Sequence, residues 1–499
     1  MSEQLVVLLV IVPLITAPLC LILRKPNWVW GMSAVACLLV LIISSVLWHQ
    51  CDKYGPISYA FGGWEPPWGI EYRIDSLSSF LLVAISLVSF GVISFARKSV
   101  EHEITPHKVP QFYAALLLTL TGFLGIVSTA DIFNLFVFFE ISALSSYALI
   151  STGPRRSALI AAYRYFIMGS IGATFLLAGI GFLYLQTGTL NMPDLSSRLA
   201  TLEVSAATKM AFVFIVVGIG LKMALFPMHV WLPNAYRFAP STVTIFLAAI
   251  SSKVAFYVLI RFCFDIFSFE FSFGSMALGY ILIPLSLLAM VLGSITAIFQ
   301  TDIKFMMVYS SVASIGYLVL GVCLLSQLGI QASLIHLFNH ALTAAALFMA
   351  LGCISYQISN HTPLKDSLKL SDLGGLGQRM PYTMAGFLVA GLSLVGAPLT
   401  AGFISKWYLI LAVLEAEWWS VLPVLVIAML LALVYVWKVV EVAYFQPINE
   451  KISDVQEAPL PLLLPLWVLA AGCIYFGVHS TLVTHTSSQA AKLLLGGSS

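Results

Sequence analysis

Charged residues are scarce in this sequence. Asp, Glu, Lys and Arg make up 9% of its 499 residues, whereas hydrophobic residues make up 60%. A soluble protein carries about 25% charged residues, so the composition excludes a soluble domain and indicates an all-α polytopic membrane protein. The net charge of +2 is small, which argues against nucleic acid as a partner.

The sequence also lacks the motifs that hold cofactors. Its seven cysteines are scattered without a C-x-x-C pair, so they form no iron–sulfur or zinc framework. No G-x-G-x-x-G motif follows a strand-like run, which argues against a nucleotide site. We therefore expect no cofactor, no metal ion, and no redox or hydrolytic site in this chain. The first apolar run has no basic segment before it, so we interpret it as a permanent helix and not as a signal peptide.

Long apolar runs are what the chain has instead. A spanning helix needs about 20 apolar residues, and the sequence predicts fourteen such helices. Their predicted starts are near Leu5, Trp28, Leu77, Phe112, Ile132, Ile160, Met210, Val243, Ala277, Phe305, Ala332, Thr383, Trp419 and Pro461.

Two of the predicted helices are interrupted. The seventh breaks at Pro227 and the twelfth at residues 396–398, a Gly-Ala-Pro sequence. Interrupted spans at matching positions in two halves indicate an inverted repeat. We expect helices 1–3 in residues 1–110, a first repeat of helices 4–8 in 111–262, a second repeat of helices 9–13 in 275–447, and helix 14 with a tail in 458–499.

Lys and Arg are unevenly distributed between the two sides of these helices. Fifteen of the 24 lie in predicted loops on one side, six lie on the other, and the remaining three lie within spans. Cytoplasmic loops carry the excess of Lys and Arg. Both termini are therefore predicted to lie on the non-cytoplasmic side.

Glu140 and Lys222 are charged residues inside apolar helices. A charge at bilayer depth is costly and usually functional. Burial disfavours the charged form of lysine, so Lys222, close to the break at Pro227, is expected to exchange a proton. A Glu140 that faces it would change its proton affinity with the state of the lysine. The alternatives are a permanently protonated or purely structural Glu140, and a Lys222 that extends to the membrane interface.

Lys253 and Lys406 are the other two lysines within predicted spans. Lys253 follows Ser251 and Ser252, and Lys406 follows the second break. Extension to the interface is an alternative for both.

His336 and His340 are four residues apart, so they share one helix face. A third metal ligand is not evident near them, and histidine titrates near neutral pH. We therefore expect a proton relay between Lys253 and Lys406, with a structural histidine pair as the alternative. His229, after the first break, is either a relay member or a structural cap.

Five segments around these residues resemble one family in the same order. They are FNLFVFFEIS around Glu140, GLKMALFPMHVWLPNAY around Lys222, SSKVAFYVLIRF around Lys253, HLFNHALTAAALF, and GAPLTAGFISKW, which contains Lys406. Together they resemble the antiporter-like subunits shared by Mrp-type cation/proton antiporters, respiratory complex I and membrane-bound hydrogenases. The segment WLPNAYRFAPSTVT and Lys406 resemble the D subunits of the Mrp type.

The resemblance implies a hydrophilic axis along the membrane plane. In this family a coupled Glu and Lys pass protons to a second Lys, a His and a terminal charged residue. These would be Glu140, Lys222, Lys253, His340 (or His336) and Lys406. Three departures favour a larger role for the histidines and water in the middle of the relay. Asn234 replaces the Asp of many members, Ser314 the His or Gln of some, and Ala344 the Lys of several.

The function implied is a proton-translocating subunit of a multisubunit Mrp-type sodium/proton antiporter. The alternative is a proton-pumping subunit of a redox-driven complex, of the NADH-quinone oxidoreductase or membrane-bound hydrogenase type. In both cases the expected partners are other membrane subunits of a hetero-oligomeric complex and the lipid bilayer. Protons are the expected transported ion, and whether sodium passes through this subunit stays open. The expected location is the prokaryotic cell (inner) membrane.

Overall fold

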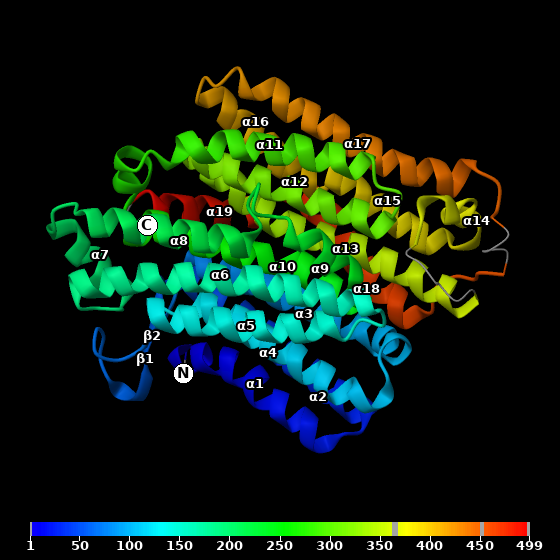
Figure 1. Cartoon of the computed structure of the whole chain (residues 1–499), viewed down its shortest axis with the longest axis horizontal. Helices are drawn as coiled ribbons and strands as arrows, with labels where there is room; N and C mark the ends of the chain where they lie inside the picture. Colours follow the sequence, from blue (N-terminus) through cyan, green and yellow to red (C-terminus); the bar gives the residue numbers. More distant parts are fainter. Residues whose placement is uncertain (1, 362–367, 450–453, 497–499) are drawn as a thin grey trace.

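The computed structural model describes residues 2–361, 368–449 and 454–496. Its long helices form a bundle in which the helix axes are roughly aligned (Figure 1). Within the described residues, thirteen helices are long and apolar enough to cross a membrane. They are α1 (Ser2–Leu23), α2 (Pro26–Tyr54), α3 (Ser76–Glu103), α4 (Val109–Ser128), α5 (Ile132–Ser151), α6 (Arg156–Thr187), α8 (Ala206–Met223), α10 (Ser241–Ile260), α11 (Leu278–Ile298), α12 (Ile303–Cys323), α13 (Gln327–His361), α17 (Val421–Phe445) and α18 (Leu460–Val478).

The remaining predicted span is divided into two half-helices, α15 (Pro381–Val395) and α16 (Ala401–Glu415). The fourteen predicted spans therefore correspond to this divided one and to thirteen helices long enough to cross a membrane, of which α8 ends just before the first predicted break. The largest offset between predicted and observed starts is five residues, at α13, which begins at Gln327 and not near Ala332.

The first predicted break separates α8 from α9 (Trp231–Phe238). A helix that ends at membrane depth leaves carbonyl groups that need donors. The Trp231 indole supplies one, because its Nε1 donates to the Leu221 carbonyl over 3.0 Å.

The second predicted break lies between α15 and α16, where the Lys406 ammonium supplies the donor. Its Nζ donates to the carbonyls of Leu394 and Val395, each over 2.8 Å. Gly396 has a φ of +88°, and a Cβ there would lie 2.7 Å from Lys406 Cδ. A glycine therefore lets the lysine side chain reach back across the break.

Several short elements were not predicted from the sequence. The loop between α2 and α3 contains an antiparallel hairpin in which Ile57 pairs with Ile74, and the predicted C-terminal tail contains an amphipathic helix. The short elements are β1 (Ile57–Ala60), η1 (Phe61–Gly63), β2 (Glu71–Ile74), η2 (Pro106–Lys108), α7 (Met192–Thr201), η3 (Arg261–Ile266), η4 (Glu270–Ser275), η5 (Leu370–Leu373), α14 (Leu376–Arg379) and α19 (Thr481–Leu494).

The two ends of the bundle differ. The start of α1, the β1–β2 hairpin, α7 and α19 lie at one end, which we call the terminal face (Figure 1). The α1–α2 connection and α14 lie at the other end, the opposite face. Most loop Lys and Arg belong to the opposite face, although two that contribute to the predicted bias, Lys365 and Lys451, lie outside the described residues.

The centre of the bundle is formed by α10, α12 and α13, which are buried along nearly their whole length. In contrast, α2, α17 and α18 have most of their residues at least partly exposed and form the outer wall. Three of the candidate residues, Lys253, His336 and His340, are on the central helices α10 and α13.

Candidate functional site

Glu140 and Lys222 form an ion pair inside the bundle. Lys222 Nζ lies 3.1 Å from Glu140 Oε1, although the two residues are 82 positions apart in the sequence. The lysine side chain is 4% exposed and the glutamate side chain 28% exposed. The ammonium also lies 5.9 Å from the centre of the Phe139 ring, close enough for a cation–π contact.

The position of Lys222 follows from the end of its helix. α8 ends at Met223, so Lys222 lies in the last turn, where the helix dipole favours a positive charge. A small void of about 10 Å³ borders Lys222 and is also lined by Ser251 of α10. It has the volume needed for about one water molecule and connects the pair to the helix that carries Lys253.

Lys253 is buried in the middle of α10. It is 2% exposed, which rules out extension to the membrane interface. Its Nζ donates to the Ala248 carbonyl over 2.7 Å. Among the ion pairs of the described residues, none includes Lys253 or Lys406. These two lysines therefore differ from Lys222, which has a carboxylate partner.

His336 and His340 are neighbours on α13, as their spacing predicts. Their ring centres are 5.5 Å apart with an interplanar angle of 30°. His336 Nδ1 lies 3.0 Å from Ser405 Oγ, and both histidines are buried. Within the described part of the chain, His336 Nε2 and His340 Nδ1 have no hydrogen-bond partner. Each histidine therefore has one ring nitrogen whose proton is not fixed by a neighbouring group.

Tyr317 of α12 connects Lys406 to the histidines, a role that the sequence analysis missed. The Lys406 ammonium lies 5.0 Å from the centre of the Tyr317 ring, and that ring lies 5.5 Å from the His336 ring. Lys406 is 3% exposed, so extension to the interface is excluded here too. Tyr317 is one of two tyrosines in this apolar helix, and no spacing signal in the sequence singles it out.

His229 lies between α8 and α9, apart from this group. Its ring stacks on Phe226 at 5.2 Å and meets the Tyr309 ring edge-on at 6.5 Å. Within the described residues its ring contacts include none of the other candidates. The structure therefore does not join His229 to the Glu140–Lys222 pair.

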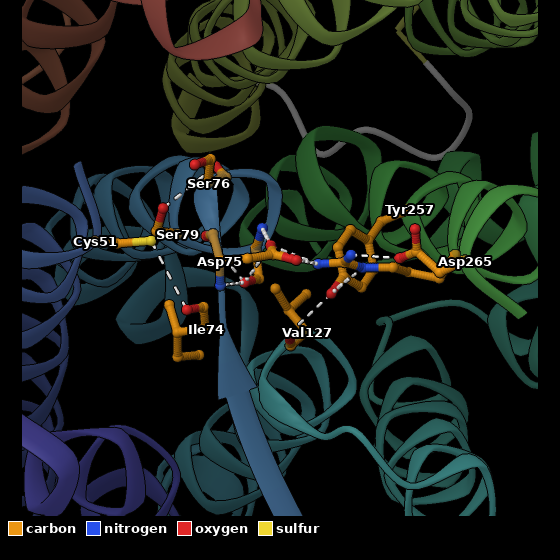
Figure 2. Close-up of polar contacts among 10 residues, drawn as sticks. Cys51, Ile74, Asp75, Ser76, Ser79, Val127, Tyr257 and Asp265 are labelled. Carbon is orange, nitrogen blue, oxygen red and sulfur yellow. Dashed lines mark hydrogen bonds and ion pairs between the residues drawn. The ribbon is translucent and has the colours of Figure 1, made fainter. Parts of the chain in front are cut away.

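Ion pairs at both ends of α10 were also missed by the sequence analysis. At the terminal face, Arg261 pairs with Asp75 and Asp265, the two carboxylates labelled in Figure 2. These side chains line a cavity of about 280 Å³. At the opposite face, Arg237 pairs with Asp302, beside a cavity of about 120 Å³. Partners separated by 65 and 186 residues leave no local signal in the sequence.

No metal-binding group is found among the described residues. In this part of the chain, no three His, Cys, Asp or Glu side chains are placed so that they could share an ion. The seven cysteines are all free and buried.

Comparison with protein families gives one match over most of the chain. The family model described as "NADH:quinone oxidoreductase/Mrp antiporter, TM" matches residues 129–432. The matched segment contains all seven candidate residues, from Glu140 to Lys406.

Two curated relatives match nearly the whole chain. One is the N subunit of the NADH-quinone oxidoreductase of Desulforudis audaxviator, which is 38% identical over 96% of this chain and 97% of its own length. The other is the D subunit of the Na(+)/H(+) antiporter of Alkalihalophilus pseudofirmus, which is 28% identical over 99% of this chain and 97% of its own length.

Two solved structures have the same fold. A chain of the membrane-bound sulfane sulfur reductase, an archaeal respiratory membrane complex, superposes with a TM-score of 0.88 at 29% identity and covers 99% of this chain and 98% of itself. A chain of the Mrp complex from Dietzia sp. DQ12-45-1b superposes with a TM-score of 0.89 at 23% identity, covering 99% and 97%.

Proposed function

The chain belongs to the NADH:quinone oxidoreductase/Mrp antiporter membrane family, and from this membership we propose that it is the proton-translocating subunit of a multisubunit membrane complex. The observation that carries the proposal is the intramembrane ion pair of Glu140 and Lys222, followed by two further buried lysines that belong to no ion pair of the described residues. Charges at bilayer depth are retained mainly on ion pathways.

The proposed route begins at Glu140 and Lys222, passes Lys253 and the histidine pair, and ends at Lys406. A proton added to Glu140 removes the counter-charge of Lys222, which favours release of the lysine proton toward α10. The void shared by Lys222 and Ser251 supports this direction. The contacts from His336 to Tyr317 and from Tyr317 to Lys406 support the second half of the route.

Glu140 also supports the proposal that other membrane subunits are partners. It lies on the same helical face as Phe133, Val137 and Leu144, whose exposed fractions are 46%, 37% and 54%. A carboxylate at membrane depth faces protein and not lipid. A neighbouring subunit that covers this face of α5 would exclude lipid from Glu140 and would place its own charges near the start of the route.

The energy source of the complex has two candidates. The first is sodium/proton antiport in an Mrp-type assembly, which the resemblance of the motifs to D subunits favours. The second is a redox-driven complex, which the 38% identity to an NADH-quinone oxidoreductase subunit favours. The proteins that co-purify with the chain distinguish them: iron–sulfur proteins support the second candidate, and small membrane subunits alone support the first.

The test of proton translocation is Glu140→Gln, which keeps the size and hydrogen bonding of the side chain but removes its titration. We expect the complex to assemble and proton flux in membrane vesicles to fall about tenfold or more. Glu101→Gln is the matched control, because Glu101 is a 43% exposed carboxylate that pairs with Lys98 on the surface. Normal flux in the assembled Glu140→Gln complex would disprove the proposed role of the pair.

We further propose that the terminal face is non-cytoplasmic. The excess of Lys and Arg in loops of the opposite face supports this orientation. A reporter that is active only in the cytoplasm should give no signal when fused after Ser499. A strong signal would reverse the assignment.

A further inference from the structure

One face of α10 leads from Lys253 to the terminal face. Lys253, Tyr257 and Arg261 are spaced by four residues each, so they lie along the same side of the helix. At 1.5 Å per residue, Arg261 is about 12 Å from Lys253 along the axis.

Arg261 uses all three guanidinium nitrogens in a network at the end of this face. Its Nε donates to Tyr257 Oη over 3.0 Å, Nη1 donates to Asp265 Oδ2 over 2.5 Å, and Nη2 donates to both oxygens of Asp75 over 2.6 Å. Figure 2 shows Tyr257 and Asp265 on one helix and Asp75 at the start of another.

The two carboxylates of this network have different environments. The Asp75 side chain is 7% exposed and caps α3 by accepting from the Ser78 N–H. Burial opposes the charge of Asp75, but Arg261 and the Ser78 N–H outweigh burial and hold the pKa of this carboxyl below its ordinary value. The Asp265 side chain is 30% exposed. Asp75 is therefore a fixed anion, whereas Asp265 is accessible from outside.

The network borders the cavity of about 280 Å³. A water molecule occupies about 30 Å³ in the liquid, so the cavity has room for several. The charged side chains that line it are Arg73, Asp75, Arg261 and Asp265. Tyr257, which lies between Lys253 and Arg261 on this face of α10, also lines it. α7 and α19 contribute the uncharged residues Met192, Pro193, Ser196 and Leu493. Two acids and two arginines leave no excess charge that would trap an ion of either sign.

The other end of α10 borders the second cavity. Ser241 and Thr244, in its first turn, line the cavity of about 120 Å³ together with Glu103, Arg237, Asp302 and Lys304. Lys253 thus lies between a cavity at each end of its own helix. The Lys253 ammonium donates a hydrogen bond to the Ala248 carbonyl, so it is directed toward the opposite face.

We propose that the cavity beside Arg261 is a hydrated vestibule through which Lys253 exchanges protons with the terminal face, with Asp265 as the exchanging carboxylate and Arg261 as a positioning residue. The inference rests on the proposed function. When the Lys253 side chain turns toward Tyr257, its ammonium transfers a proton through water in the cavity to Asp265. Lys253 becomes neutral and Asp265 becomes a carboxylic acid. The acid loses its ionic attraction to Arg261 and releases the proton to the solvent.

The first test measures access and does not depend on transport. Single cysteines are introduced at two lining residues by Ser196→Cys, in α7, and Tyr257→Cys, one helical turn from Lys253. Membrane-impermeant maleimide is then added to one side of sealed vesicles. Ser128→Cys is the control, because Ser128 is buried and adjacent to a lining residue but does not line the cavity. The parent chain, with seven buried cysteines, gives the background.

We expect both lining variants to be labelled about tenfold faster than Ser128→Cys, and only from the terminal face. Labelling of Tyr257→Cys no faster than the control would overturn the vestibule. Labelling from the opposite face would overturn its assignment to the terminal face.

The second test measures proton flux in vesicles that contain the complete complex. We expect Asp265→Asn to lower flux about fivefold and to weaken its dependence on pH at the terminal face, since the exchanging acid is lost. The dependence of proton flux on the pH at the opposite face should be unchanged. Glu270 is an exposed carboxylate outside the cavity. Glu270→Gln should therefore leave the flux and both of its pH dependences unchanged. If Asp265→Asn does not assemble, Asp265→Glu replaces it and should retain flux with a shifted pH profile.

A purely structural network gives a different result. Asp265→Asn or Asp265→Glu would then lower the amount of folded complex but leave flux per complex and both pH profiles unchanged, which overturns the proposal. If Glu140→Gln abolishes flux and the Asp265 variants do not alter it, this inference fails while the proposed function stands. If Glu140→Gln transports normally, the proposed function fails, and the labelling still decides whether the vestibule exists.

Discussion

The α8–α9 break and the α15–α16 break both place an ammonium group at the carbonyl end of a half-helix, but the lysines come from opposite sides of the break. Lys222 precedes its break and lies in the last turn of α8, where its ammonium donates to the Glu140 carboxylate. Lys406 follows its break and reaches back from α16 to the carbonyls of Leu394 and Val395.

The donors that close the breaks differ as a result. At the first break the Trp231 indole bonds the Leu221 carbonyl, so Lys222 is free to pair with a carboxylate. At the second break the lysine itself bonds the freed carbonyls and therefore has both a structural and a proposed conducting role. A carboxylate pairs with the first lysine, whereas two backbone carbonyls and the Tyr317 ring contact the second.

The largest expected effect is at the first break, with Lys222→Arg. Arginine keeps the positive charge and the pairing with Glu140 but does not release its proton. We expect proton flux in vesicles at matched expression to fall about tenfold or more, nearly as far as with Lys222→Ala. Full activity of Lys222→Arg would show that Lys222 acts only as a fixed positive charge and does not transfer a proton, which would contradict the relay.

A smaller effect is expected at the second break, with Lys406→Arg and Lys406→Glu. Arginine can still donate to the carbonyls of Leu394 and Val395, so the fold should be kept while flux decreases about threefold to tenfold. A protonated glutamate can donate to one of these carbonyls, so Lys406→Glu should retain some flux. Lys406→Met is the reference, because it leaves both carbonyls unpaired, and flux in it should be lower than in Lys406→Glu.

Much of this comparison could be predicted from the sequence. Bilayer thickness fixes the length of apolar runs, and Pro227 and Gly396 stop helices by local chemistry, so both the spans and the breaks were predicted. Three isolated lysines and a histidine pair at a spacing of four are also local signals. The chemical roles of these residues stay predictions.

The groups that close and connect the breaks could not be predicted. The indole of Trp231 and the ring of Tyr317 contact their lysine-bearing segments only after the helices pack. Arg261 has no local signal for its pairing with Asp75, because the two residues lie 186 positions apart. A paired arginine buried in the bundle and a solvated loop arginine look the same in a single sequence.

The smallest expected effect tests whether the first break needs its own donor. Trp231→Phe removes the hydrogen bond to the Leu221 carbonyl but keeps an aromatic ring against Tyr165, on which Trp231 stacks at 4.0 Å. The Leu221 carbonyl then keeps only the longer hydrogen bond from the Ala224 N–H, at 3.3 Å. The loss of one hydrogen bond costs about 0.5–1.5 kcal/mol, so the free energy of unfolding in detergent should decrease by that amount. Since the pair of Lys222 and Glu140 does not use the indole, proton flux should fall by about twofold or less. The matched change at the second break is Lys406→Met, which should lower both stability and flux. If Trp231→Phe abolished flux at normal stability, the indole would belong to the conducting route. The group that donates to the freed carbonyls would then also take part in proton transfer at the first break, as is proposed for Lys406 at the second.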